Sequence, residues 1–223
     1  MVQIANITPL SNFKLADKYN DMHLLLYHWG LESLNYNRVC RLSNVYKIAD
    51  NSQFELRKEI DYDDFLKWTI KVKADEVIAP DVMYNFRRTK KLIEEFIPKV
   101  PVGMKIQGVV CGSTISQLVD CYNWLHENER IDVIAFSKHG CTIKKKIDHF
   151  DARQDLFDLV LPTHKPVHFL GVNHFLDFFT PGIRSIDGKF LAKVANDNEK
   201  IDLYTKVDNC KLEVLFKLFE HIK

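Results

Sequence analysis

Short runs of apolar residues alternate along this chain with longer segments in which apolar positions recur every three or four residues. Within the short runs nearly every position is apolar, which is typical of parallel strands that helices bury on both faces. The longer segments have the spacing of amphipathic helices. We assign seven of the apolar runs as strands: residues 22–27, 45–49, 76–80, 104–110, 132–136, 167–172 and 183–186.

The helical segments are bounded by residues that suit helix ends. An acidic stretch that begins at Asp61 precedes an apolar stripe over residues 65–72, and negative charge is favourable at a helix amino terminus. Thr114, preceded by Ser113, is a potential amino-terminal cap. Further apolar stripes lie at 92–97, 115–125 and 212–219.

A strand followed by a helix, repeated along the chain, favours a (β/α)8 barrel, the TIM-barrel fold. An open, doubly wound sheet is the alternative. The first assigned strand and its continuation, MHLLLYHWG, contain no glycine-rich phosphate-binding loop, which argues against that alternative. We therefore predict a compact α/β barrel that forms a single domain over residues 1–223. An eighth strand is not identified, and the polar segment 190–208 is ambiguous.

The amino-acid composition limits only the broad class of protein. Apolar residues make up 46% and charged residues 27% of the 223 positions, as in ordinary globular proteins. The formal net charge is +1, so binding to nucleic acid would have to use a local basic patch. No apolar run approaches the roughly 20 residues of a membrane span, and MVQIANITPL lacks the design of a signal peptide.

The five cysteines are scattered along the chain, and no two of them form a CxxC pair. This pattern suggests neither a disulfide framework nor a structural zinc site. We therefore expect a reducing, cytoplasmic setting and no bound metal.

Three aspartates follow three of the assigned strands: Asp50, Asp81 and Asp187. The carboxyl-terminal ends of all strands in a barrel meet at one mouth, where catalytic residues collect. Each aspartate alone is explained as a turn or helix-cap residue. Clustered carboxylates repel one another, and together they suit acid–base, nucleophilic or metal chemistry. A metal site is the first rival interpretation, with His139 and His174 as candidate ligands.

Five segments occur in an order that resembles a known enzyme family: ADNSQFEL (49–56), ADEVIAPDVMYNFRRT (74–89), KIQGVVCGST (105–114), VHFLGV (167–172) and IRSIDG (183–188). Together they are similar to the tRNA-guanine transglycosylase superfamily. The likeness is greatest to a compact branch, found in phages and some archaea and bacteria, whose members include DNA transglycosylases that install 7-deazaguanine bases. The resemblance extends from about Met22 to Lys193.

The resemblance implies a role for each aspartate. Asp187 matches the nucleophile that attacks C1′ of the target nucleoside, and Asp50 matches the acid–base residue. Asp81 matches the aspartate that binds the guanine-like base. Gly140 and its neighbour His139 lie where family members contact that base with backbone groups.

The sequence also departs from the family pattern. Cys111 precedes Gly112 where the family usually has a glutamine that reads the base, and we predict that Cys111 lines the base pocket. Residues 51–53 read Asn-Ser-Gln where the family has Ser or Asn followed by two glycines. The carboxyl-terminal zinc module of the tRNA enzymes is absent, since only Cys210 lies in that region. These departures favour DNA over tRNA as the substrate.

The residue types fit base exchange without a cofactor. One carboxylate captures the oxocarbenium-like sugar covalently, while a second carboxylic acid protonates the leaving base. The target base has to leave its stack, and Phe54, Tyr84 and Phe136 are candidates to sandwich it, although each also suits the core. We assign contacts to the sugar–phosphate backbone to Arg87, Lys144, Lys145, Arg184 and Lys189, with Lys146 as a further candidate.

Three other functions stay open at this point. The first is a tRNA-directed enzyme of the same class. The second is a barrel that binds a nucleobase or nucleic acid and has lost turnover, and the third is an unrelated hydrolase that uses the three acids with a metal. The departure at Cys111 allows the second reading, whereas the presence of both Asp50 and Asp187 argues against it.

Overall fold

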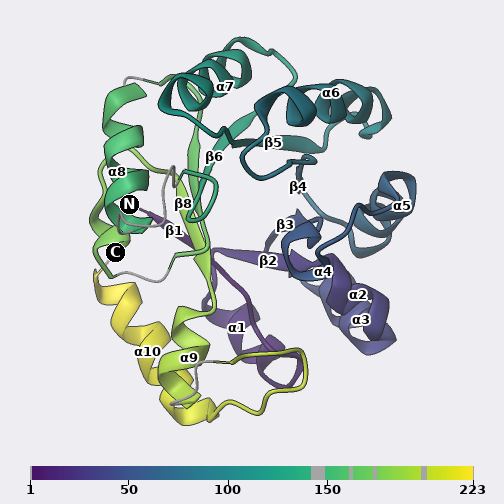
Figure 1. Cartoon of the computed structure of the whole chain (residues 1–223). Coiled ribbons are helices and arrows are strands. Elements are labelled where there is room, and N and C mark those ends of the chain that lie inside the picture. The colour runs from purple at the N-terminus through teal and green to yellow at the C-terminus, as the bar shows by residue number, and fades with distance from the viewer. Residues whose placement is uncertain (1, 142–148, 161–162, 173–174, 197–199, 223) are drawn as a thin grey trace.

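The chain forms a closed barrel of eight parallel strands, described here from a computed structural model that covers residues 2–141, 149–160, 163–172, 175–196 and 200–222. The strands follow one another around the barrel in sequence order, and the last pairs with the first (Figure 1). Their bounds are β1 Gln3–Asn6, β2 Met22–Leu26, β3 Tyr46–Asp50, β4 Glu76–Ile78, β5 Lys105–Val110, β6 Val133–Ser137, β7 Val167–Leu170 and β8 Ser185–Gly188.

Helices surround the strands (Figure 1). The α-helices are α1 Phe13–Tyr19, α2 Tyr27–Glu32, α3 Leu34–Leu42, α4 Gln53–Leu56, α5 Tyr62–Val72, α6 Phe86–Phe96, α7 Ile115–Glu127, α8 His149–Val160, α9 Phe190–Asn196 and α10 Asn209–Ile222. Short 3-10 helices are η1 Leu10–Asn12, η2 Ile97–Lys99 and η3 Phe175–Phe179. The predicted (β/α)8 barrel is confirmed, and the alternative of an open, doubly wound sheet is wrong.

The eighth strand comes from the amino-terminal segment, which the sequence analysis did not assign. In β1, Gln3 pairs with Ser185 of β8, and Ala5 pairs with Met22 of β2. This strand has only four residues, two of them polar, so it lacks the long apolar run that identified the other seven. The ambiguous segment 190–208 adds no strand among its described residues, and it begins with α9.

Predicted helix starts are confirmed at two positions. The Asp61 carboxylate caps α5 by accepting hydrogen bonds from the backbone amides of Asp63 (2.8 Å) and Asp64 (3.1 Å). The Thr114 hydroxyl caps α7 by accepting from the amide of Gln117. Each cap satisfies backbone donors that a helix leaves unpaired at its first turn.

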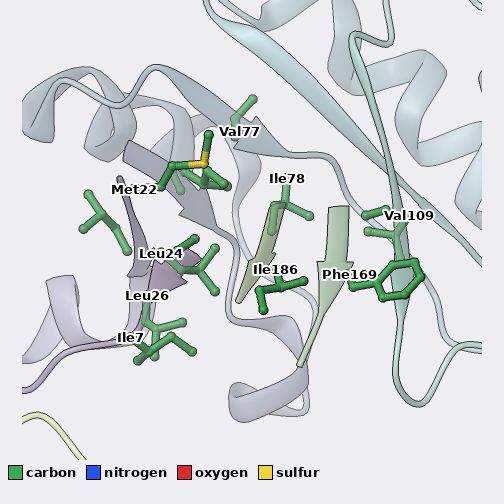
Figure 2. Close-up of a cluster of buried hydrophobic side chains, with 14 of the residues drawn as sticks. Ile7, Met22, Leu24, Leu26, Val77, Ile78, Val109, Phe169 and Ile186 are labelled. Carbon is green, nitrogen blue, oxygen red and sulfur yellow. The ribbon is translucent and has the colours of Figure 1, made fainter. Parts of the chain in front are cut away.

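Alternate residues of each strand point into the barrel, where they form a layered apolar core. Figure 2 shows part of this core, with Leu24 and Leu26 of β2 on one side, Ile78 and Ile186 in the middle, and Val109 with Phe169 on the other side. These residues are almost fully buried. In barrels of this fold the interior is a packed core, and ligands bind at the end where the strands finish.

Among the described residues, no helix is long and apolar enough to cross a membrane.

Candidate active site

A cavity of about 720 Å³ opens at the carboxyl-terminal mouth of the barrel. Asp50, Asp81 and Asp187 all line it, so the structure brings the three predicted aspartates together. Apolar side chains that include Leu24, Ile78 and Val109 also line this space. The acids therefore sit against a surface of low polarity, where electrostatic interactions are stronger than in water.

Asp187 belongs to β8 and is 3% exposed. Its Oδ1 atom lies 3.1 Å from Nε2 of His168 in β7, and it accepts a hydrogen bond of 3.0 Å from the backbone amide of Gly171. Gly171 has a φ of +70°, a conformation that glycine adopts without strain, and this conformation directs its amide toward the carboxylate. One oxygen of Asp187 is thus fixed from two sides.

Asp50 is the last residue of β3, and its Oδ1 accepts a 2.5 Å hydrogen bond from the amide of Ser52. Ser52 has a φ of 55°, in the left-handed region, so the backbone keeps a conformation suited to glycine although glycine is not present. Its hydroxyl in turn accepts from the amide of His28 at 3.2 Å. The strained turn after β3 therefore holds the Asp50 carboxyl in place.

The environment of Asp50 favours its neutral form. Burial raises the pKa of Asp50 well above its ordinary value of 3.8, and the negative charge of Glu55 raises it further. The hydrogen bond from the Ser52 amide acts in the opposite direction but does not offset burial. These effects favour the protonated form of Asp50, which is the form that a general acid needs.

Asp81 follows β4 and also has a raised pKa. Burial moves the pKa of its carboxyl from 3.8 to about 6. The adjacent turn is fixed by Thr89 of α6, whose hydroxyl accepts a 2.7 Å hydrogen bond from the amide of Val82. A carboxyl group that exchanges a proton near pH 6 can act either as donor or as acceptor toward a polar ligand.

Glu55 of α4 is a fourth acid in the cavity, which the sequence analysis did not select. Loss of water around its carboxyl raises its pKa, and the positive charge of Lys189 partly offsets this effect. Burial also lowers the pKa of Lys189, whose ammonium lies 5.3 Å from the ring of Trp29 and donates to the carbonyl of Ile201 at 3.0 Å. Lys189, predicted to contact nucleic acid, therefore does line the cavity.

An aromatic pair lies at the mouth. The ring of Phe54 in α4 stacks on the imidazole of His139, which follows β6, with a centroid distance of 5.3 Å and an interplanar angle of 8°. Both residues line the cavity. Of the three aromatic residues considered for stacking, Phe136 is fully buried in the core, Tyr84 lies outside the cavity lining, and only Phe54 lines the cavity.

Basic side chains accompany the acids around the opening. Arg57 and Lys58 are exposed, whereas the others are partly buried. The basic residues that line the cavity are Arg57, Lys58, Lys138, Lys189 and Lys193. Such a group provides the local positive charge that a near-neutral protein needs in order to bind a phosphate backbone.

The prediction that Cys111 lines the cavity is wrong. Strand β5 ends at Val110, and Cys111 packs between α6 and α7, where it is completely buried. Its thiol donates to the hydroxyl of Thr89 at 3.1 Å, and its amide contacts the sulfur of Cys121 at 3.4 Å. Cys111 is therefore a packing residue in this structure.

Three other predicted contacts also lie outside the cavity lining. Gly112 faces the first turn of α7, where a side chain would collide with the backbone at Leu118. Gly140 donates its amide to the hydroxyl of Ser137 at 2.7 Å, so it supports a lining residue without lining the cavity itself. Arg87 is exposed on α6 and likewise lies outside the lining.

The prediction that Arg184 contacts nucleic acid at the mouth is also wrong. Arg184 immediately precedes β8, so it lies at the amino-terminal end of the barrel, opposite the cavity. Its guanidinium forms two hydrogen bonds with the buried carboxylate of Glu76, at 2.7 and 3.0 Å. Lys144 and Lys145, together with Lys146 and His174, lie outside the described residues.

A metal-assisted site was the main alternative for the three acids. Within the parts of the chain that the structure describes, no three or more His, Cys, Asp or Glu side chains are grouped as metal ligands would be.

The sequence analysis missed the acid Glu55 and the imidazole of His168, as well as the basic lining residues Arg57, Lys58 and Lys193. Alternation along β7 offered a signal for His168, because it lies two positions before the cavity residue Leu170 and so points into the barrel. Its pairing with Ser185 across the β7–β8 ladder was visible only in the folded register.

Comparison with models of known protein families gives no match, and comparison with curated proteins gives none either. The fold and the site define the protein as a (β/α)8 barrel with an acid-lined cavity at its carboxyl-terminal mouth.

Proposed function

We propose that the protein is a guanine transglycosylase, which exchanges a guanine in nucleic acid for a 7-deazaguanine base through a covalent glycosyl-enzyme intermediate. The observation that carries the proposal is that a fixed carboxylate, Asp187, and a carboxyl with a raised pKa, Asp50, line the same cavity. Retaining chemistry at a sugar requires this division between a nucleophile and an acid.

In the first half of the reaction, Asp187 attacks C1′ of the target nucleotide as the bond from C1′ to the base breaks. Asp50 gives its proton to the departing base, whose leaving would otherwise place negative charge on a ring nitrogen. In the second half, the incoming base attacks C1′ and releases Asp187, while Asp50 recovers a proton from that base. Each carboxyl returns to its starting state.

We assign binding of the base to Asp81, because its carboxyl lines the cavity and can donate or accept a hydrogen bond near pH 6. Phe54 offers a flat surface at the opening on which a flipped base stacks. The cations at the rim, such as Lys58 and Lys193, support contacts with backbone phosphates. DNA is the favoured substrate and tRNA the alternative, because residues 1–223 do not contain the cysteine cluster that binds zinc in the tRNA enzymes.

The test is base exchange followed by mass spectrometry of the digested nucleosides. Purified protein is incubated with 7-cyano-7-deazaguanine and, in separate reactions, guanine-containing duplex DNA, single-stranded DNA or tRNA. We expect the modified nucleoside in DNA and its complete loss in Asp187→Asn, because an amide cannot form the glycosyl ester. Product in tRNA alone would identify the tRNA enzyme.

Two further variants sharpen this test. Asp50→Asn should lower turnover by about 10²–10⁴-fold, the usual contribution of a general acid–base group. Asp120→Asn is the matched control, because Asp120 is exposed on α7 and outside the cavity lining, and it should retain full activity. Full activity in Asp187→Asn would exclude the covalent mechanism, and binding of bases without exchange would indicate the non-catalytic barrel.

A further inference from the structure

A chain of polar side chains runs through the barrel interior from its amino-terminal end to the cavity. Glu76 of β4 holds the guanidinium of Arg184, and Nε of Arg184 donates to the hydroxyl of Ser185 at 2.9 Å. The Ser185 oxygen lies 2.7 Å from Nδ1 of His168, and Nε2 of the same ring lies 3.1 Å from Oδ1 of Asp187. Ser185 and His168 are completely buried, so water cannot replace these contacts.

The chemistry of these groups gives the chain a direction. Arginine can only donate, so the Ser185 oxygen accepts from Arg184. The Ser185 hydroxyl proton then has Nδ1 of His168 as its partner, and the imidazole proton lies on Nε2, facing Asp187. In the other neutral tautomer, the lone pair of Nε2 would face the carboxylate of Asp187, and the two would repel each other. The hydroxyl proton of Ser185 would also be buried without an acceptor, which is unfavourable.

This arrangement treats the two oxygens of Asp187 differently. Oδ1 receives donors from both His168 and Gly171. Among the described residues, Oδ2 has no hydrogen-bond partner, and Asp187 lines the cavity. Oδ2 is therefore the oxygen available to a ligand.

We propose that His168 is a positioning residue for the nucleophile. Ser185 and Arg184 fix its Nε2–H tautomer, and the imidazole then holds Oδ1 of Asp187 so that Oδ2 attacks. In the reaction, Oδ2 forms the bond to C1′ while the electron pair of the C1′–base bond leaves with the base, which takes its proton from Asp50. His168 keeps its proton throughout. This inference rests on the proposed function, and it reassigns Arg184 from nucleic-acid contact to anchor of the chain.

Two isosteric variants separate the contacts of His168. The amide nitrogen of Gln in His168→Gln reaches the position of Nε2, so the donor to Asp187 is kept. The shorter amide in His168→Asn reaches the position of Nδ1, so only the contact with Ser185 is kept. We expect the kcat of His168→Gln to stay within about 10-fold of the wild-type value. The kcat of His168→Asn should be about 10- to 100-fold lower than that of His168→Gln, which corresponds to the loss of one hydrogen bond to a charged group.

The Michaelis constant for the incoming base should change little in either variant, because His168 acts on the nucleophile and not on the base. Thermal unfolding of both variants identifies any loss that comes from folding. Equal losses of kcat in the two variants, with folding unchanged, would overturn the proposal.

A measurement on the resting protein does not depend on activity. Long-range ¹H–¹⁵N NMR spectra distinguish the two imidazole tautomers, and the His168 signals among the nine histidines are assigned by comparison with His168→Gln. We expect the Nε2–H form in wild type and a mixture of forms in Ser185→Ala. An Nδ1–H tautomer in wild type would overturn the proposal even if the variants fail to fold. If neither DNA nor tRNA is modified, the proposed function fails, whereas the Nε2–H form would still support the positioning of Oδ1 by His168.

Discussion

Acidic side chains lie at both ends of the barrel interior, but among the described residues Glu76 has an arginine partner whereas Asp50 and Asp81 have no ion pair. At the amino-terminal end, Glu76 is completely buried and bound by Arg184 through two hydrogen bonds, and the Tyr46 hydroxyl donates a third at 2.9 Å. At the mouth, partial burial raises the pKa values of Asp50 and Asp81, and neither carboxyl forms an ion pair with a described residue.

The difference shows how one residue type serves two purposes. A buried carboxylate with a bidentate arginine partner is fully satisfied, and it holds strands together. A buried carboxyl without such a partner costs stability, but it keeps a proton that can be transferred near neutral pH. The paired end therefore supports the fold, and the raised pKa values at the unpaired end fit the acid–base role that we propose for it.

The largest effect should come from breaking the pair at the amino-terminal end. Glu76→Leu leaves the partly buried guanidinium of Arg184 without its counter-charge, and we expect a loss of about 3–5 kcal/mol in the free energy of unfolding. Urea denaturation followed by circular dichroism measures it. The double variant Glu76→Leu with Arg184→Met should recover most of the loss, since it removes both charges. A single variant within about 1 kcal/mol of wild type would mean that the pair contributes little.

A smaller effect of opposite sign is expected at the mouth. The folded protein keeps the proton of Asp81 up to about pH 6, whereas the unfolded chain releases it near pH 3.8. Between these values the folded state binds more protons, so wild type loses stability as pH rises. Asp81→Asn avoids this cost, and it should be more stable by up to about 2 kcal/mol above pH 6 and about equal to wild type below pH 3.8.

Urea denaturation of the Asp81→Asn variant at pH 3.5 and pH 7.5 tests this sign. Asp120→Asn, an exposed substitution on α7, is the control and should show no such dependence on pH. An equal difference between Asp81→Asn and wild type at both pH values would show that burial of Asp81 does not penalise its charge.

The smallest effect concerns backbone conformation at the two ends. Arg57, at the mouth, and Lys73, where α5 ends at the opposite side, are both exposed and have left-handed φ values of 51° and 57°. Glycine adopts this conformation freely, so each substitution to glycine should raise stability by less than about 1 kcal/mol. Only Arg57→Gly should also weaken binding of an oligonucleotide and reduce its dependence on salt, because Arg57 lines the cavity. Equal binding by both variants would place the nucleic acid elsewhere.

The sequence predicted the barrel well because buried parallel strands are rich in apolar residues, whereas β1 is short and half polar and was not recognised. It also placed Asp50, Asp81 and Asp187 at one mouth, since strand direction alone decides which end a following residue occupies. These inferences need no knowledge of how side chains pack.

The predictions for Arg184 and Cys111 were wrong because the position of each side chain depends on where a strand begins or ends. Strand β8 begins at Ser185 and not at position 183, which leaves Arg184 before the strand and at the end opposite the cavity. Cys111 follows the last residue of β5, where the chain turns toward α7 and the alternation of the strand no longer applies. A difference of one or two residues in a strand boundary thus decides whether a side chain reaches the cavity.

Closure of the barrel by β1 has a consequence for how the protein is made. Gln3 precedes its partner Ser185 by 182 residues, so it leaves the ribosome well before that partner is made. At about 5–20 residues per second, β1 and its neighbour wait roughly 10–40 seconds with one hydrogen-bonding edge unpaired. An unpaired edge of this kind invites pairing with another chain. Only four residues long and half polar, β1 limits the surface that is exposed during this interval.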